Sequence, residues 1–87
     1  MDIQEFRTRW SGLPHSLRRD LAHNCRDYLT PQVRERNACF LTGAVGAFAE
    51  CGRIDNETAV YLRALIGCIE RQSWTRTFVL NEWRAEQ

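Results

Sequence analysis

Apolar side chains recur every three or four positions along most of this chain, which is the spacing of one face of an α-helix. The first such segment, residues 3–10, carries Phe6 and Trp10 on one face. Asp2 followed three positions later by Glu5 forms a capping box, which predicts that a helix starts there. A glycine and a proline shortly after the segment predict its end.

Two longer helices are expected next. The first covers residues 15–29, and its predicted buried face carries Leu17, Leu21, Cys25 and Tyr28. Thr30 followed by Pro31 indicates a new helix, because threonine caps helices and proline suits the first helical position. This third helix is expected to extend to about residue 51.

The second half of the third helix is apolar on nearly every side, so we place this helix at the centre of the fold. Its predicted stripe is Val33, Asn37, Phe40, Ala44 and Phe48, with Leu41, Val45 and Ala49 beside it. Gly43 and Gly46 lie within it, where a glycine costs about 1 kcal/mol relative to alanine. Such small residues favour the close approach of another helix, within the chain or across a dimer. A phosphate-binding loop would need a strand-to-helix turn that this segment lacks.

Gly52 predicts the end of that helix, and Asp55 predicts the start of the next, residues 56–71. The core face of this fourth helix is Leu62, Leu65, Ile66 and Ile69. Residues 73–80 are rich in β-branched and aromatic side chains and could form a strand. A lone strand would have no partner, so we expect a fifth helix or an extension of the fourth.

The predicted fold class is therefore all-α, a compact four- to five-helix bundle around a central helical hairpin made by residues 31–51 and 56–71. A chain of 87 residues leaves room for a single helical domain, residues 1–87. Because so small a core gives modest stability, we also expect a homodimer.

Charge and hydropathy exclude several classes of protein. Twelve basic and eleven acidic residues leave a net charge of +1, which disfavours a dedicated polyanion binder but leaves local patches open. The longest uncharged stretch, residues 37–49, is shorter than the roughly 20 residues of a membrane span. The first ten residues are charged and amphipathic, unlike a secretory signal. We therefore expect a cytoplasmic protein that does not cross a membrane.

The four cysteines are spaced too widely for a zinc site. In a cytoplasm they would be reduced, and we expect most of them to be buried as small apolar side chains. Cys39 and Cys68 lie equally far from the turn between the two hairpin helices, and the spacing leaves open whether they face each other. We predict neither a metal nor another cofactor.

No arrangement of side chains predicts catalysis. His15 and His23 are the only histidines, and neither is spaced to activate a cysteine. The carboxylates are scattered among arginines, as surface ion pairs are. We therefore predict no catalytic residue and no enzymatic activity.

A basic stripe is the strongest polar candidate. Its members would hold an anion or nucleic acid and are Arg18, Arg19, His23, Arg26, Arg34 and Arg36. The alternative is that neighbouring carboxylates, among them Asp20 and Asp27, simply neutralise the stripe. A helix-turn-helix is disfavoured, because the turn lacks the usual glycine and the interval is too long.

Aromatic residues cluster at the two ends of the chain and include Phe6, Trp10, Trp74, Phe78 and Trp83. Either the terminal helices pack together through them, or they form a partly exposed surface with the composition of an interface hot spot. Both can hold at once.

The predicted function is a small non-catalytic protein-binding module that acts by occluding a partner surface. Adaptors, inhibitors and regulatory subunits of bacterial and phage systems include such proteins. The alternative is an arginine-based regulator that binds nucleic acid.

Overall fold

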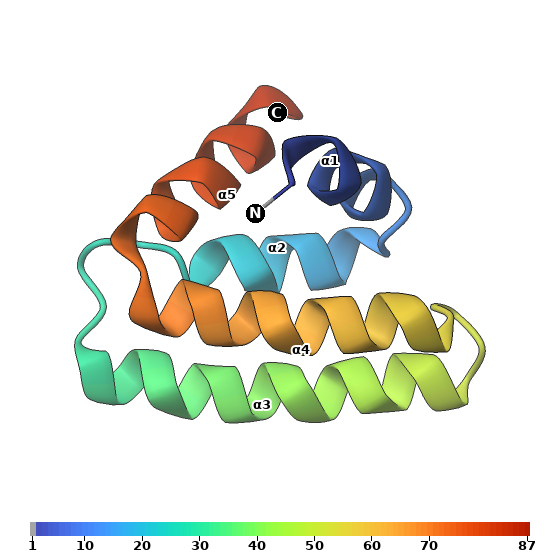
Figure 1. Ribbon diagram of the computed structural model, residues 1–87. Helices are drawn as coiled ribbons and strands as arrows, with labels where there is room; N and C mark the ends of the chain where they lie inside the picture. Colours follow the sequence, from blue (N-terminus) through green and yellow to red (C-terminus); the bar gives the residue numbers. More distant parts are fainter. Residues whose placement is uncertain (1) are drawn as a thin grey trace.

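The computed structural model describes residues 2–87, which form five helices and no strand. α1 spans Ile3–Ser11, α2 His15–His23, α3 Pro31–Glu50, α4 Asn56–Arg71 and α5 Ser73–Ala85. α3 lies along one edge of the molecule, α4 and α2 lie in the middle, and α1 and α5 cover the opposite side (Figure 1). The predicted all-α bundle is confirmed, and α3 and α4 form its helical hairpin.

Three side-chain caps start helices where the sequence predicts them. Asp2 Oδ1 accepts a hydrogen bond from the Glu5 amide at 3.1 Å at the start of α1. Thr30 Oγ1 accepts from the Val33 amide at 3.2 Å before α3. Asp55 Oδ1 accepts from the Thr58 amide at 2.7 Å before α4. Each cap satisfies an amide that has no partner within its helix, so these starting points are fixed locally.

The end of α3 is fixed by a glycine. Gly52 has a φ of 73°, a left-handed conformation that side chains other than glycine rarely adopt. This conformation lets the Arg53 amide donate back to the Phe48 carbonyl at 2.9 Å. The chain thereby turns sharply into α4, as predicted.

α2 is shorter than predicted, and this is the largest error in the expected helix boundaries. It ends at His23 rather than Leu29, and Tyr28, expected on its buried face, is 71% exposed. Residues 24–30 form an irregular loop whose carbonyl groups bind Arg34 instead of continuing the helix.

Arg34 is buried, with 6% of its surface exposed, and reaches back from α3 into this loop. Its Nη1 donates to the Asn24 carbonyl at 2.5 Å, and its Nη2 donates to the carbonyls of Arg26 and Leu29, each at 3.2 Å. The buried Asn24 amide group donates in return to the Arg34 carbonyl at 3.2 Å and accepts from Asn37 at 3.1 Å. This Arg34–Asn24 network joins α2 to α3.

α3 lies at the edge of the fold, so its expected central position is wrong. Its buried residues are Arg34, Ala38, Leu41 and Val45, a face rotated by about one position from the predicted stripe. Phe40, placed in that stripe, is 74% exposed. The apolar composition of α3 comes largely from glycine and alanine, which bury little surface, so it does not require a central location.

α4 occupies the position expected of α3. Its inward face is the predicted one and is completed by an alanine, giving Ala59, Leu62, Leu65, Ile66 and Ile69. α5 follows as a separate helix, because Gln72 has an extended backbone (φ −127°, ψ 113°) that interrupts the helical path. Thr75, Val79 and Leu80, residues that suit a strand, are buried on the inner face of α5. The predicted fifth helix is thus confirmed.

Between residues 2 and 87, no helix combines the length and the apolar character needed to cross a bilayer.

We predict that replacing Arg34 by methionine lowers the free energy of unfolding by about 2–4 kcal/mol, because three loop carbonyls lose a charged donor. Arg34→Lys should be intermediate, since an ammonium group cannot reach carbonyls in several directions as a forked guanidinium does. Urea denaturation followed by circular dichroism measures both changes.

The matched control is Arg84→Met, because Arg84 is exposed near the end of α5. Its effect should be within about 0.5 kcal/mol. Equal losses of stability at positions 34 and 84 would contradict the role assigned to the Arg34–Asn24 network.

Candidate functional site

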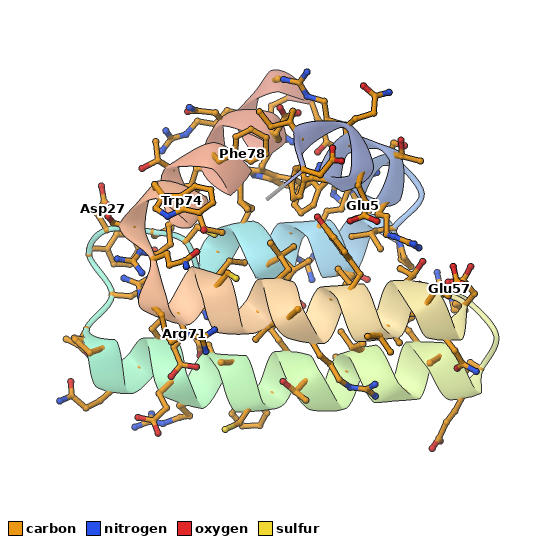
Figure 2. The ribbon with its side chains drawn as sticks, viewed as in Figure 1. Glu5, Asp27, Glu57, Arg71, Trp74 and Phe78 are labelled. Atoms are coloured by element: carbon orange, nitrogen blue, oxygen red, sulfur yellow. The ribbon has the colours of Figure 1, made fainter. Side chains whose placement is uncertain are left out.

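A shallow apolar groove between α4 and α5 is the strongest candidate site. Its volume is about 240 Å³, and its walls are Tyr61, Ala64, Leu65, Cys68, Gln72 and Trp74. We call it the Trp74 groove. Trp74 projects outward where α5 begins, on the same side of the molecule as Phe78 (Figure 2). Trp74 is 54% exposed, whereas Trp10 is 5% exposed, so Trp74 offers aromatic surface that the core does not use.

Local structure explains why the groove forms. Tyr61, Ala64 and Cys68 follow one another at intervals of three and four along α4, so they line one face. The break at Gln72 then redirects the chain, and Trp74 lies in the first turn of α5. Arg76 fixes this change of direction, because its Nη1 donates to the Ile69 carbonyl at 2.8 Å, near the end of α4.

Tyr61 contributes an aromatic ring with a hydroxyl group to the groove wall. The Arg9 guanidinium carbon lies 5.6 Å from the centre of the Tyr61 ring, a cation–π distance. The Tyr61 hydroxyl is buried and finds no hydrogen-bond partner among the described residues. Burial raises the pKa of Tyr61, and the nearby Glu5 adds to that rise, so the phenol stays protonated near neutral pH. The groove is therefore uncharged.

The other aromatic candidates pack within the molecule. Phe6 is 1% exposed and stacks on Trp10, with ring centres 5.4 Å apart. Phe78 meets Phe6 edge-on at 5.0 Å, and Trp83 lies 5.3 Å from the ring of His15. Phe6 and Phe78 thus join α1 to α5, and Trp83 packs α5 against the start of α2. Among the predicted interface residues, Phe6 and Trp10 are core residues, Phe78 and Trp83 are half-buried, and Trp74 is exposed.

Contacts within the protein also engage two members of the predicted basic stripe. Arg34 donates to backbone carbonyls inside the fold, which removes it from any anion site. Arg18 lies against the ends of α1 and α5, with its Nε 3.2 Å from a Glu86 carboxylate oxygen and its Nη1 3.4 Å from the Ser11 carbonyl. Glu86 also accepts a hydrogen bond from Trp10 Nε1 at 2.6 Å. Arg18 and Arg34 therefore do not share a surface.

The remaining members of the stripe lie on or near the surface. Arg19 pairs with its neighbour Asp20 at 3.2 Å. His23 and Arg36 are exposed, and Arg26 is half-buried. A neighbouring carboxylate therefore neutralises the charge of Arg19, as the alternative interpretation of the stripe expects. An exposed ion pair of this kind contributes little energy to stability.

A larger hollow of about 540 Å³ lies between α1 and the start of α4, but most of its polar side chains already contact one another or neighbouring groups. Asp55 caps α4, and hydrogen bonds from Thr58 lower the pKa of its carboxyl. Arg9 donates to Thr58 Oγ1 at 3.0 Å. Arg53 lies over the Phe48 ring at 5.1 Å. Groups committed in this way to one another do not converge on a ligand.

All four cysteines are free thiols, but fewer are buried than expected. Cys25 is buried, Cys68 is half-buried in the wall of the Trp74 groove, and Cys39 and Cys51 are exposed. Cys39 borders a different hollow, between α3 and α4, so the structure places Cys39 and Cys68 on separate surfaces. Within residues 2–87, no three potential metal-ligating side chains of His, Cys, Asp or Glu come together.

Sequence reasoning identified Trp74 but missed Tyr61, Ala64 and Cys68 as its neighbours. Their spacing along α4 was the available signal, because it defines a second, weakly apolar face beside the strongly apolar core face. Only the direction of α5 shows that Trp74 completes this face.

The chain matches no family model, and no curated protein and no solved structure shows significant similarity to it.

We predict a fixed order of thiol reactivity in the native protein. Burial raises the pKa of the Cys25 thiol to about 12, which leaves very little nucleophilic thiolate. Iodoacetamide near neutral pH should therefore alkylate Cys39 and Cys51 first, Cys68 more slowly, and Cys25 only on unfolding. Mass spectrometry of peptides from a time course measures the order, and rapid alkylation of Cys25 in the folded protein would contradict it.

Proposed function

We propose that this protein is a small non-catalytic binding module that occludes a surface of a protein partner, and that the Trp74 groove is its contact. The observation that carries this proposal is the half-exposed Trp74 beside a weakly apolar groove. Tryptophan is enriched among the residues that dominate interface energies, because it buries a large area with little loss of side-chain freedom.

The dimensions of the groove favour a protein over a small molecule. Pockets for small molecules usually measure about 300–1,000 Å³ and enclose most of the ligand, whereas this groove measures about 240 Å³ and lies at the surface. One apolar side chain of a partner fits such a space. Tyr61, whose pKa is raised by burial, contributes no charge at neutral pH that would have to be neutralised on binding.

Arg71 is not part of this contact, because its guanidinium lies against Gly67, beside the hollow between α3 and α4. The wall of the groove carries no charged side chain. We therefore infer a partner that presents an apolar side chain to the groove.

Binding would act by covering the partner's surface, with no bond made or broken and no cofactor. The arrangement of α4 and α5 supports this mode, because Arg76 of α5 donates to the Ile69 carbonyl of α4 and Thr75, in the first turn of α5, is fully buried. A preformed contact loses little conformational entropy when it binds. We further propose that the protein acts in the cytoplasm and as a homodimer.

We predict that Trp74→Ala lowers the affinity for the partner by about tenfold or more. The partner is first captured from native lysate with the tagged full-length chain, in nuclease-treated and untreated halves, and is then titrated in purified form. Binding should survive nuclease and depend weakly on salt, since the contact is apolar. An association that nuclease abolishes, with affinity falling steeply as salt rises, would favour the arginine-based alternative instead.

Tyr28→Ala is the matched control, because Tyr28 is an exposed aromatic residue outside the groove. Cys68 supplies a second readout. A bound partner should slow alkylation of Cys68 while leaving the exposed Cys51 unaffected. Full affinity in Trp74→Ala together with unprotected Cys68 would refute the groove as the contact.

A further inference from the structure

The outer face of α3 carries a regular row of exposed residues. One of them, Phe40, also borders a hollow that Asp20 and His23 of α2 line. The row is Arg36, Phe40, Gly43, Ala47 and Glu50, and all five residues are exposed. Their spacing of four, three, four and three positions is that of a seam between two paired helices. α3 lies at the edge of the molecule, and no other element of the described chain covers this side (Figure 1). We call this row the α3 seam.

Gly43 is the member of the α3 seam that the fold itself does not explain. A Cβ atom added there would meet nothing within 4 Å, so no neighbouring element requires a glycine. Glycine inside a helix is nevertheless destabilising relative to alanine. Gly67 differs, because a Cβ atom added there would lie 3.0 Å from the Arg71 guanidinium, so a glycine at position 67 leaves room for a neighbouring side chain. The close approach of a second molecule would give Gly43 a role that it lacks in the monomer.

We propose that two copies of this protein pair through the α3 seam, with the helices antiparallel and the two-fold axis passing close to Gly43. Both copies then use the same surface, as a symmetric dimer requires. The Phe40 ring of each copy would lie over Gly43 and Ala47 of the other, so the largest side chain of the seam meets the smallest ones.

Charge determines the antiparallel direction. Arg36 and Glu50 lie seven positions before and after Gly43, so an antiparallel pair brings Arg36 of each copy to Glu50 of the other. A parallel pair would instead align like charges at both ends and place the two Phe40 rings against each other. Opposite charges at the ends of a seam select partner orientation in paired helices.

This proposal gives a geometry to the proposed homodimer and does not depend on the Trp74 groove. The groove is lined by residues of α4 and α5, and the seam by residues of α3. A dimer made through the seam would therefore present two Trp74 grooves, and a partner with two copies of its binding segment would gain avidity.

Gly43→Leu tests the contact without endangering the fold, because the added side chain enters open space in the monomer. Sedimentation equilibrium over a concentration series should show a dimer for the parent protein. The variant should raise the dimer dissociation constant by about tenfold or more while keeping its helical circular dichroism. Asn81→Leu, which places an exposed leucine on α5 instead of on α3, is the control and should leave the dimer unchanged.

Charge reversal tests whether the two α3 helices of the dimer are antiparallel. Arg36→Glu and Glu50→Arg should each weaken an antiparallel dimer, because each reversal creates two like-charge contacts, and the double variant should restore it. In a parallel dimer neither single reversal changes the sign of the contacts, so unchanged association would overturn the antiparallel arrangement.

The remaining outcomes separate this proposal from the proposed function. A dimer that persists in Gly43→Leu and Phe40→Ala would overturn the α3 seam while leaving the homodimer in place. A protein that stays monomeric at every concentration would overturn both, without bearing on the groove. Trp74→Ala should leave dimerisation unchanged, and a dimer lost in that variant would place the contact at the groove instead of the seam.

Discussion

The buried guanidinium of Arg34 is the interaction on which the arrangement of the helices depends. It donates to three carbonyls of the loop after α2, and Asn24 returns a hydrogen bond to the Arg34 backbone. Burial lowers the pKa of Arg34, and the positive charge of Arg76 adds to this decrease. Burying a charged arginine is unfavourable. Carbonyls near the C-terminal ends of helices offset part of this cost, because they carry partial negative charge. Arg34 donates to such a carbonyl at the end of α2, and Arg76 donates to one near the end of α4.

This early end of α2 opens space for the rest of the fold. A helix continued to Leu29 would have carried Tyr28 inward, whereas the observed loop leaves it exposed. α2 instead packs along α5, and α4 lies between α3 and the remaining helices. The aromatic rings of α1 and α5 then close the opposite side, with Phe6 between Trp10 and Phe78. Trp74 precedes this packed region and stays at the surface.

Two outward features remain after the core is formed, and they differ in chemistry. The Trp74 groove is uncharged and holds an exposed aromatic ring, which suits a single apolar side chain of a protein partner. The α3 seam combines a central glycine, one phenylalanine and opposite charges at its ends, which suits a second copy of itself. Because the two features lie on different helices, one protein can use both at the same time.

The sequence by itself determined the all-α fold class, the starts of α1, α3 and α4, and the core face of α4. These follow from interactions within three or four residues, such as Asp55 with the Thr58 amide, which the order of residues displays directly. Only the tertiary structure decided where α2 ends, which face of α3 is buried, and that Phe6 and Trp10 are core residues while Trp74 is exposed. Each of these depends on contacts between residues ten or more positions apart, including Arg34 with Asn24 and Phe6 with Phe78. Hydrophobic periodicity indicates that a helix has an apolar face. The packing of the whole chain decides which of the apolar residues on the helix are buried.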